Sequence, residues 1–551
     1  MIDYHEKETI ERQIETTLPC QSLQTTEQLL DTFEVQSTAD LIVSLYKNKV
    51  CSDPTALSVV VAFQFPDSLL SYSSAVVEHL YEHIGKNIQC KVDLVVLADT
   101  TFGSCCVDTV AAEHACVDLI VHYGPSCLSR PASTFPVLVV LEKAPIDIPA
   151  TVAYFISQFS LDLLQPVLVM YDLAYHHAAQ HLAQALAAAG FIHLIWPHIE
   201  TVYNMPKLDT NDIQHKPSVF KSDLAKYGDA CIRETQGQKY ILPEGVQIQD
   251  VTMFYIGDES LNLTNLMMTH SMCKQVIAYN PVLNTGSVQS GSANKLLMRR
   301  YFMVQKAKDA DVIGIVVGTL GLASYLPVIE NLKRLVLASG KKPYMLALGK
   351  PSPAKLGNFL EIDVFVLVAC PQNALLETRD FLRPVVTPYE LCIALDRNAE
   401  WDVSKYQLDL VTVDHQLSDT IHRIAERQMT RTNLDNGDGL DDSDDDQPHF
   451  SLVTGAYKQR KQYVSIVCST DDEPTQGDSS ALMARSRDNV ISKYTSTSAA
   501  AEYLNNRTFQ GLEAMVGQTT ISDVQDGRRG IARGYINPNV EAKNDDSLDK
   551  S

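Results

Sequence analysis

The chain has 551 residues, of which 45% are hydrophobic and 20% charged, and its formal net charge is -22. One hydrophobic core seldom extends beyond about 250–300 residues, so this length predicts several compact units. The negative charge argues against nucleic acid and anionic lipid as direct partners, because proteins that bind them carry a basic face.

No targeting or membrane segment is expected. The start of the chain, Met1 to Glu8, is polar and lacks the basic and apolar regions of a signal peptide. The most apolar long stretch, residues 312–329, is interrupted by three glycines and a proline, which argues against a membrane span. We therefore expect a cytoplasmic protein without membrane contact. In that reducing compartment its 12 cysteines are expected to be thiols or metal ligands.

Strand and helix signals alternate from about Asp40 to Asp396. A β-branched run at residues 57–63 precedes apolar residues at helical spacing in residues 69–84. This alternation predicts an α/β fold with mainly parallel sheets covered by helices.

Two sequence patterns each occur three times. A short apolar strand ends in a glycine-bearing loop at residues 119–124, 253–258 and 313–319. A strand runs into a longer loop at residues 94–106, 166–177 and 364–373. Three matching pairs predict three similar α/β units.

The composition also suggests where these units begin and end. We expect a polar lead-in, three α/β units and a C-terminal extension, at residues 1–40, 41–148, 149–282, 283–400 and 401–551. The second unit carries a polar insertion at residues 202–249. The acidic run at residues 434–447 lacks the pattern of a calcium loop and is expected to be disordered, because its charges repel. Residues 503–512 carry aromatic and leucine side chains that can dock on the folded body.

The candidate metal ligands are cysteines that follow predicted strands. Cys105 and Cys106 follow one strand, Cys127 the next, and Cys370 a strand much later in the chain. These separations exclude a local zinc knuckle, so folding has to assemble any shared metal site. Three thiolates from different loops suit a soft centre, and an iron–sulfur cluster held by only three cysteines leaves one iron open for a substrate.

Each cysteine has an alternative role as a buried thiol that packs in the core. We favour Cys106 over Cys105, because successive side chains of an extended loop point in opposite directions and only one can face the cavity. Seven further cysteines lie in no partner motif and are expected to be core residues: Cys51, Cys90, Cys116, Cys231, Cys273, Cys392 and Cys468.

Other familiar motifs are weak or absent. His176 and His177 invite a metal or acid–base role, but an exposed first turn of a helix explains them, and His122 is expected to be a satisfied strand-end residue. The glycines of residues 314–321 do not form a dinucleotide fingerprint, and the chain contains no phosphate loop and no nucleophile elbow.

Five sequence blocks together resemble the diphthamide-synthesis family. They are DTTFGSCCVD at residues 99–108, HYGPSCL at 122–128, VGTLG at 317–321, VACP at 368–371 and RPVVTPYE at 383–390. The similarity runs from about Leu41 to Leu395. The last block and residues 503–512 resemble the second subunit of that family's heterodimer more than the first.

This resemblance implies three α/β units around a central 4Fe-4S cluster. The family cleaves S-adenosylmethionine reductively to a 3-amino-3-carboxypropyl radical and transfers that group to a histidine of translation elongation factor 2. The eukaryotic enzyme is a heterodimer of a first and a second subunit, served by a small iron-binding electron donor. On this basis the expected ligands are Cys106, Cys127 and Cys370.

One departure from the family pattern bears on the mechanism. Catalytic relatives place a cluster cysteine in the middle unit, whereas residues 171–177 here read YDLAYHH, so Cys127 could supply the missing thiolate. The resemblance then implies a cluster that relays electrons or supports the partner's cluster, with bond breaking in the partner. Two alternatives stay open: a metal-free scaffold that recruits elongation factor 2, and a zinc-stabilised protein, for which three thiolates lack an evident fourth ligand.

Overall fold

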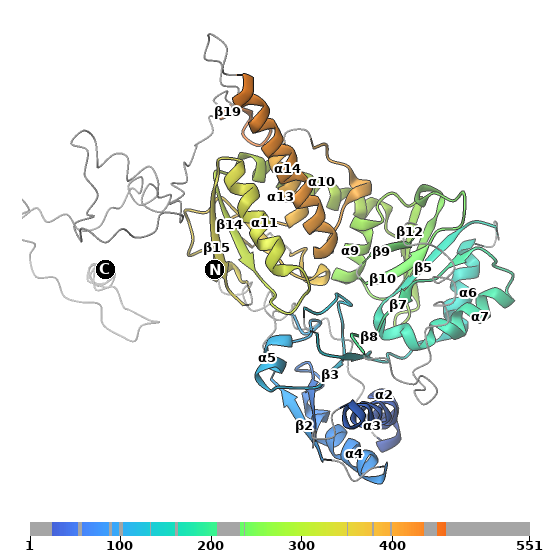
Figure 1. The fold of residues 1–551 in the computed structure, drawn as a ribbon. Coiled ribbons are helices and arrows are strands. Elements are labelled where there is room, and N and C mark those ends of the chain that lie inside the picture. Colours follow the sequence, from blue (N-terminus) through green and yellow to red (C-terminus); the bar gives the residue numbers. More distant parts are fainter. Residues whose placement is uncertain are drawn as a thin grey trace, which may run out of the picture. The chain divides into compact units, whose positions relative to one another are not determined.

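The computed structural model describes twelve stretches of the chain (Figure 1). They are residues 25–52, 58–87, 91–98, 103–132, 134–159, 164–205, 232–235, 237–349, 351–376, 380–396, 399–434 and 449–458. The predicted docking segment and the acidic run beyond Leu434 lie outside these residues.

The first sheet has five strands in the order β2-β1-β3-β4-β8. Four are parallel, and the short β8 is antiparallel to β4. The strands are β1 (Ser58–Gln64), β2 (Lys91–Leu97), β3 (Leu119–Tyr123), β4 (Val137–Val140) and β8 (Val202–Tyr203). The neighbouring helices are α2 (Thr26–Thr32), α3 (Val35–Ser52), η1 (Leu70–Tyr72), α4 (Ser73–Asn87) and α5 (Thr109–His114). Apolar side chains of α2, α3 and α4 cover one face of this sheet.

The second sheet has the order β13-β12-β11-β5-β6, with only β13 antiparallel. Its strands are β5 (Val167–Tyr171), β6 (Leu194–Ile195), β11 (Thr252–Ile256), β12 (Gln275–Asn280) and β13 (Thr285–Val288). Its helices are α6 (Ile148–Phe159), η2 (Leu173–Ala178), α7 (Ala179–Ala188), η4 (Ile248–Asp250) and α9 (Leu261–Thr269). One apolar cluster contains residues of both the first and the second sheet, and in it Phe155 of α6 makes an edge-on ring contact with Phe254.

The third sheet is wholly parallel, in the order β15-β14-β16-β17. Its strands are β14 (Val312–Val317), β15 (Lys342–Ala347), β16 (Val364–Val368) and β17 (Val385–Val386). The helices here are α10 (Ser290–Asp309), α11 (Tyr325–Ala338), α12 (Pro353–Leu356), η5 (Pro371–Asn373), α13 (Pro388–Leu395), η6 (Val403–Lys405) and α14 (Leu410–Leu434). The sequence did not predict α14, whose apolar side packs on α11 and α13.

The predicted polar insertion is partly structured. It contains β9 (Ile232–Thr235) and β10 (Gln238–Ile241), which form a small antiparallel sheet with β7 (His198–Ile199). β8 also falls within the insertion but is the edge strand of the first sheet, so the insertion contributes strands to two different sheets. A two-stranded sheet, β18 (His449–Phe450) and β19 (Tyr457–Lys458), ends the described part of the chain.

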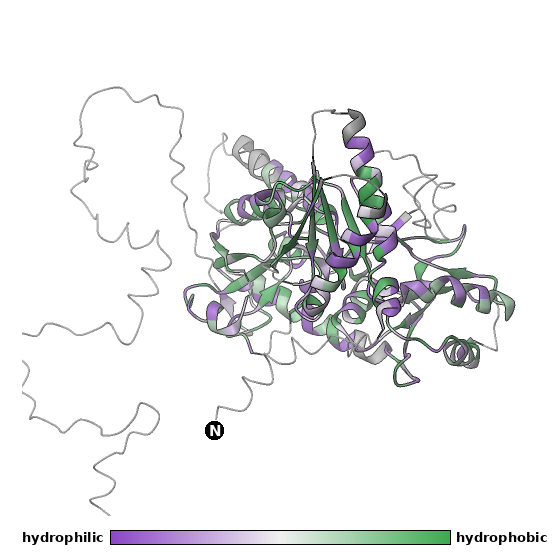
Figure 2. Ribbon diagram, turned by 90° about the horizontal axis from the view of Figure 1, so that it is seen from below, coloured by the Kyte–Doolittle hydropathy of each residue, from purple (hydrophilic) through white to green (hydrophobic). Residues whose placement is uncertain are grey.

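The mixed α/β architecture with mainly parallel sheets is confirmed. The central strands β3, β5, β11, β14 and β16 are buried along their whole length, as expected where helices cover both faces of a parallel sheet. In Figure 2 the strands inside the molecule are mostly hydrophobic (green), whereas the helices carry both hydrophobic and hydrophilic residues. The limits of the three units stay predictions. No helix in the described part of the chain is long and apolar enough to span a membrane.

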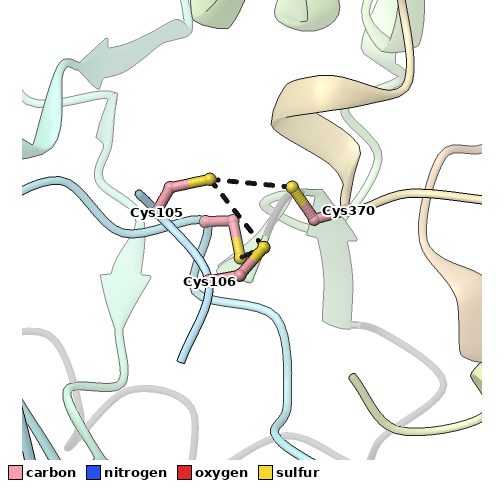
Figure 3. Close-up of side chains that lie close together, drawn as sticks. Cys105, Cys106 and Cys370 are labelled. Atoms are coloured by element: carbon pink, nitrogen blue, oxygen red, sulfur yellow. Dashed lines mark hydrogen bonds between the residues drawn. The ribbon is translucent and has the colours of Figure 1, made fainter. Parts of the chain in front are cut away.

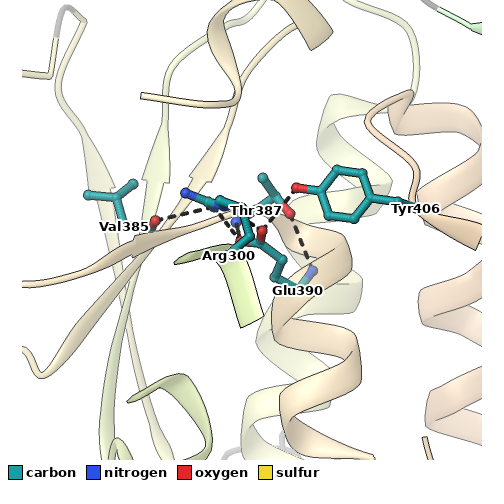
Figure 4. A network of polar contacts seen from close by, with 5 residues as sticks. All are labelled: Arg300, Val385, Thr387, Glu390 and Tyr406. Carbon is teal, nitrogen blue, oxygen red and sulfur yellow. Dashed lines mark hydrogen bonds and ion pairs between the residues drawn. The ribbon is translucent and has the colours of Figure 1, made fainter. Parts of the chain in front are cut away.

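A buried ion pair fastens α13 to α10 beside the third sheet (Figure 4). The guanidinium of Arg300 donates to both carboxylate oxygens of Glu390 and is only 4% exposed, and Glu390 is fully buried. Tyr406 donates its hydroxyl to the same carboxylate at 2.9 Å, and Thr387 forms a capping box with Glu390. The block at residues 383–390 therefore has a structural role in the described chain.

We predict that Glu390→Gln lowers the free energy of unfolding by about 3–5 kcal/mol, because Arg300 keeps its buried charge without a counter-ion. Urea unfolding followed by Trp401 fluorescence in a Trp196→Phe background measures this, since Trp401 packs against Tyr406. The control is Glu330→Gln in the exposed pair with Arg334, which should change the free energy by less than about 1 kcal/mol. Equal effects of the two variants would contradict the prediction.

Candidate metal centre

Four cysteines converge on one point between the first and third sheets (Figure 3). The sulfur of Cys105 lies 3.7 Å from that of Cys370 and 4.0 Å from that of Cys106, and the sulfur of Cys106 lies 3.9 Å from that of Cys127. All four sulfurs lie within 4.8 Å of one another and all four residues are buried. The three predicted ligands are therefore brought together, and Cys105 joins them.

The expectation that only one of the two adjacent thiols faces this point is wrong. Residues 103–106 form a tight turn, closed by the backbone N–H of Cys106 donating to the carbonyl of Gly103 at 3.1 Å. In a turn, neighbouring side chains no longer alternate as they do in extended chain. Gln64, at the end of β1, holds the loop by donating to the carbonyl of Cys106 and accepting from the N–H of Asp108, both at 2.9 Å.

The loop that carries Cys127 is tied to both neighbouring cysteine loops. The backbone N–H of Cys127 donates to the carbonyl of Cys105 at 3.0 Å. The side-chain amide of Gln372 donates to the carbonyl of Ser126 at 3.0 Å. The position of Cys127 therefore depends on contacts with residues near both other ligand loops.

Cys370 lies two residues after the end of β16 and directly precedes the short helix η5. Pro371 opens that helix, and its carbonyl accepts a 2.7 Å hydrogen bond from the side-chain amide of Asn265 on α9. Helix α9 packs on the second sheet. The second sheet thus supports this ligand loop through Asn265 but contributes no sulfur to the four-cysteine group.

The glycine-rich loop after β14 braces the cysteine loops. The carbonyl of Gly321 accepts from the N–H of Ala132, and the N–H of Ala323 donates to the carbonyl of Arg130, each at 2.9 Å. A Cβ atom on Gly321 would lie 2.4 Å from the carbonyl oxygen of Val107. Close backbone approach therefore accounts for glycine at this position.

Contacts within the group shift the pKa values of Cys105, Cys106 and Cys127. The neighbouring thiols, Cys105 first, and then burial raise the pKa of Cys106 well above its ordinary value. Contact with Cys106 lowers the pKa of Cys105, but the other two thiols and burial together raise it well above its ordinary value. Hydrogen bonding with the other three thiols, Cys105 first, lowers the pKa of Cys127 well below its ordinary value. A cation bound here would replace the thiol protons.

The donor set fits a soft metal centre. Four cysteine thiolates are the usual ligands of 4Fe-4S clusters and of closed structural zinc sites. A zinc ion bound at about 2.3 Å by a tetrahedron of thiolates sets the sulfurs about 3.8 Å apart, close to the three distances given above. A 4Fe-4S cluster binds each thiolate through a separate iron, so its binding requires the cysteine loops to move apart.

The histidines considered from the sequence, His122, His176 and His177, are not part of the four-cysteine group. His122 lies near the end of β3, and its imidazole Nε2 hydrogen-bonds the carbonyl of Pro125 at 2.9 Å. His177 is exposed, but His176 is half-buried and hydrogen-bonded to Tyr171, contrary to the expected exposed turn. Burial, together with nearby histidines, lowers the pKa of His176 to about 4.

Comparison with known proteins relates the chain to one family. A family model described as "Putative diphthamide synthesis protein" matches residues 65–407. The 2-(3-amino-3-carboxypropyl)histidine synthase subunit 2 of Danio rerio is 38% identical over 477 residues, covering 86% of this chain and 87% of that protein. The Schizosaccharomyces pombe protein of the same name is 33% identical over 519 residues, covering 94% and 92%.

Among solved structures, the chain is similar to Dph2 from Pyrococcus horikoshii with a 4Fe-4S cluster. The TM-score is 0.46 and the sequence identity 18%, over 63% of this chain and 90% of that chain.

We predict that Gly321→Ala loosens the cysteine loops, because the added methyl group forces the carbonyl of Val107 to move. Hydrogen exchange read by mass spectrometry should show faster exchange in peptides that cover residues 126–132, where Ala132 bonds Gly321. The control is Gly85→Ala in α4, where an added Cβ meets nothing within 4 Å. Unchanged exchange in Gly321→Ala would contradict the bracing role.

Proposed function

Because this chain belongs to the diphthamide synthesis protein family, we propose that it is the iron–sulfur second subunit of a 2-(3-amino-3-carboxypropyl)histidine synthase. The complete enzyme would transfer a 3-amino-3-carboxypropyl group from S-adenosylmethionine to a histidine of translation elongation factor 2. Its other components would be the first subunit, as heterodimer partner, and a small iron-binding electron donor. The reaction would take place in the cytoplasm.

The observation that carries this proposal is the convergence of Cys106, Cys127 and Cys370 from three loops distant in the sequence. These three residues would hold the 4Fe-4S cluster. Bound there, the cluster would supply one-electron transfer. The residues themselves exclude water from the centre, since each of the three is at most 4% exposed.

The proposed division of work between the subunits rests on the middle sheet. The loop after β5 carries Asp172 and His176, where the family resemblance implies a cluster cysteine in catalytic relatives. The second sheet supports the site through Asn265 of α9. We therefore assign this chain an accessory role, in which it assists reduction of the catalytic cluster of the partner, where bond breaking occurs.

A second candidate is a structural zinc site, and one observation favours it. The three cysteines expected from the sequence would leave a zinc ion without a fourth ligand. In the structure Cys105 can supply it, and its sulfur lies at distances from those of Cys106 and Cys370 that are close to the sulfur spacing of a tetrahedral zinc site. The metal that copurifies with the chain separates the two candidates.

We predict that the Cys106→Ala, Cys370→Ala double variant loses this subunit's share of iron and acid-labile sulfide, because two ligands are removed. Metal and sulfide analysis of the anaerobically purified heterodimer measures the loss, together with the visible charge-transfer absorption. The matched control, Cys273→Ala, removes a half-buried thiol outside the site and should leave both unchanged.

Three outcomes would contradict the proposal in different ways. Stoichiometric zinc in the wild-type chain would favour the structural zinc site. Unchanged iron and sulfide in the double variant would place the cluster elsewhere. A double variant that binds its partner and supports modification normally would favour a metal-free scaffold that recruits elongation factor 2.

A further inference from the structure

The sulfur of Cys105 is as well placed as those of the three expected ligands. Its 3.7 Å separation from the sulfur of Cys370 is shorter than the contact between Cys106 and Cys127. Cys105 is 6% exposed, so its thiol is withdrawn from solvent together with the rest of the group. Its carbonyl also accepts the backbone hydrogen bond from Cys127, which fixes the two loops to each other.

The side chain of Asn373 connects Cys105 to Cys370. Its amide nitrogen lies 3.2 Å from the sulfur of Cys105 and 3.2 Å from the sulfur of Cys370. An asparagine amide carries two N–H donors, so it can serve both sulfurs at once. Asn373 follows Cys370 by three residues within η5, and its own N–H donates to the carbonyl of Cys370 at 2.9 Å.

Gly103 leaves the space that this amide occupies. A Cβ atom on Gly103 would lie 2.3 Å from the amide nitrogen of Asn373. Any larger residue at position 103 would therefore displace the amide from the two sulfurs. The turn at residues 103–106 thus presents Cys105 and admits Asn373 to the same point.

We propose that Cys105 is a fourth thiolate ligand of the cluster, positioned by Asn373, and that the cluster of this chain therefore has no iron open to S-adenosylmethionine. The inference rests on the proposed function. On binding, Cys105 gives its thiol proton to solvent and forms one iron–sulfur bond, without a change of oxidation state. A cluster with every iron capped by a thiolate suits electron transfer, whereas a three-cysteine cluster offers a substrate site.

The test uses the full-length chain purified anaerobically, alone and with its partner. After mild ferricyanide oxidation, the wild-type cluster of this chain should keep its four irons and show no three-iron signal in electron paramagnetic resonance. Cys105→Ala should lose one iron in four under the same treatment. Its spectrum should also respond to added S-adenosylmethionine, to which the wild-type spectrum of the isolated chain should be insensitive. Cys273→Ala is again the control.

Asn373→Leu provides a second measurement. Loss of two hydrogen bonds to the sulfurs should shift the cluster's reduction potential to more negative values in a spectroscopic redox titration, because these bonds stabilise the more negative, reduced form. Cys273→Ala removes a thiol outside the four-cysteine group and should leave the potential unchanged. Equal potentials in both variants would overturn the role of Asn373.

The outcomes separate the two proposals. A wild-type chain without iron would defeat the proposed function itself. If the wild-type chain contains iron but loses one iron atom on oxidation, only the proposal that Cys105 is a fourth ligand is overturned. The same holds if the spectrum of the wild-type chain responds to S-adenosylmethionine. The wild-type measurements need no variant, so they decide this point even if Cys105→Ala fails to fold.

Discussion

The arrangement depends on four buried sulfurs being held within 4.8 Å of one another by loops that come from two sheets. Buried thiols have little intrinsic reason to gather, so their backbones have to be fixed. Gln64, Asn265 and Gln372 do this through hydrogen bonds to carbonyl groups in the three cysteine loops or next to them. Each of these amides comes from a different sheet or its adjoining loop, so the site requires all three sheets to be folded.

This dependence explains how the chain can contain three α/β sheets while only two of them contribute sulfur to the four-cysteine group. The second sheet supports the site through α9 and, with Phe155 of α6, shares an apolar core with the first sheet. The third sheet carries Cys370 at the end of a buried strand, and the Arg300–Glu390 pair fixes the helices behind that sheet. Support of the site and provision of its cysteines are thus divided among different sheets.

The sequence was a good guide to the strands and a poorer guide to the loops. Apolar runs such as residues 119–123 and 364–368 predicted buried parallel strands, and the cysteines that follow them marked the site. The turn at residues 103–106 was misjudged, because the rule of alternating side chains applies to extended chain and a turn closed by Gly103 breaks it. Asn373 and α14 gave no local signal, since their roles depend on partners far away in the sequence.

The central claim is that the four sulfurs bind one iron–sulfur cluster. The most direct test is anomalous diffraction at the iron and zinc absorption edges from anaerobically grown crystals of the heterodimer. The account predicts an iron signal surrounded by the sulfurs of Cys105, Cys106, Cys127 and Cys370. A zinc signal at that point, or sulfurs in contact with no metal while the partner's cluster is intact, would contradict it.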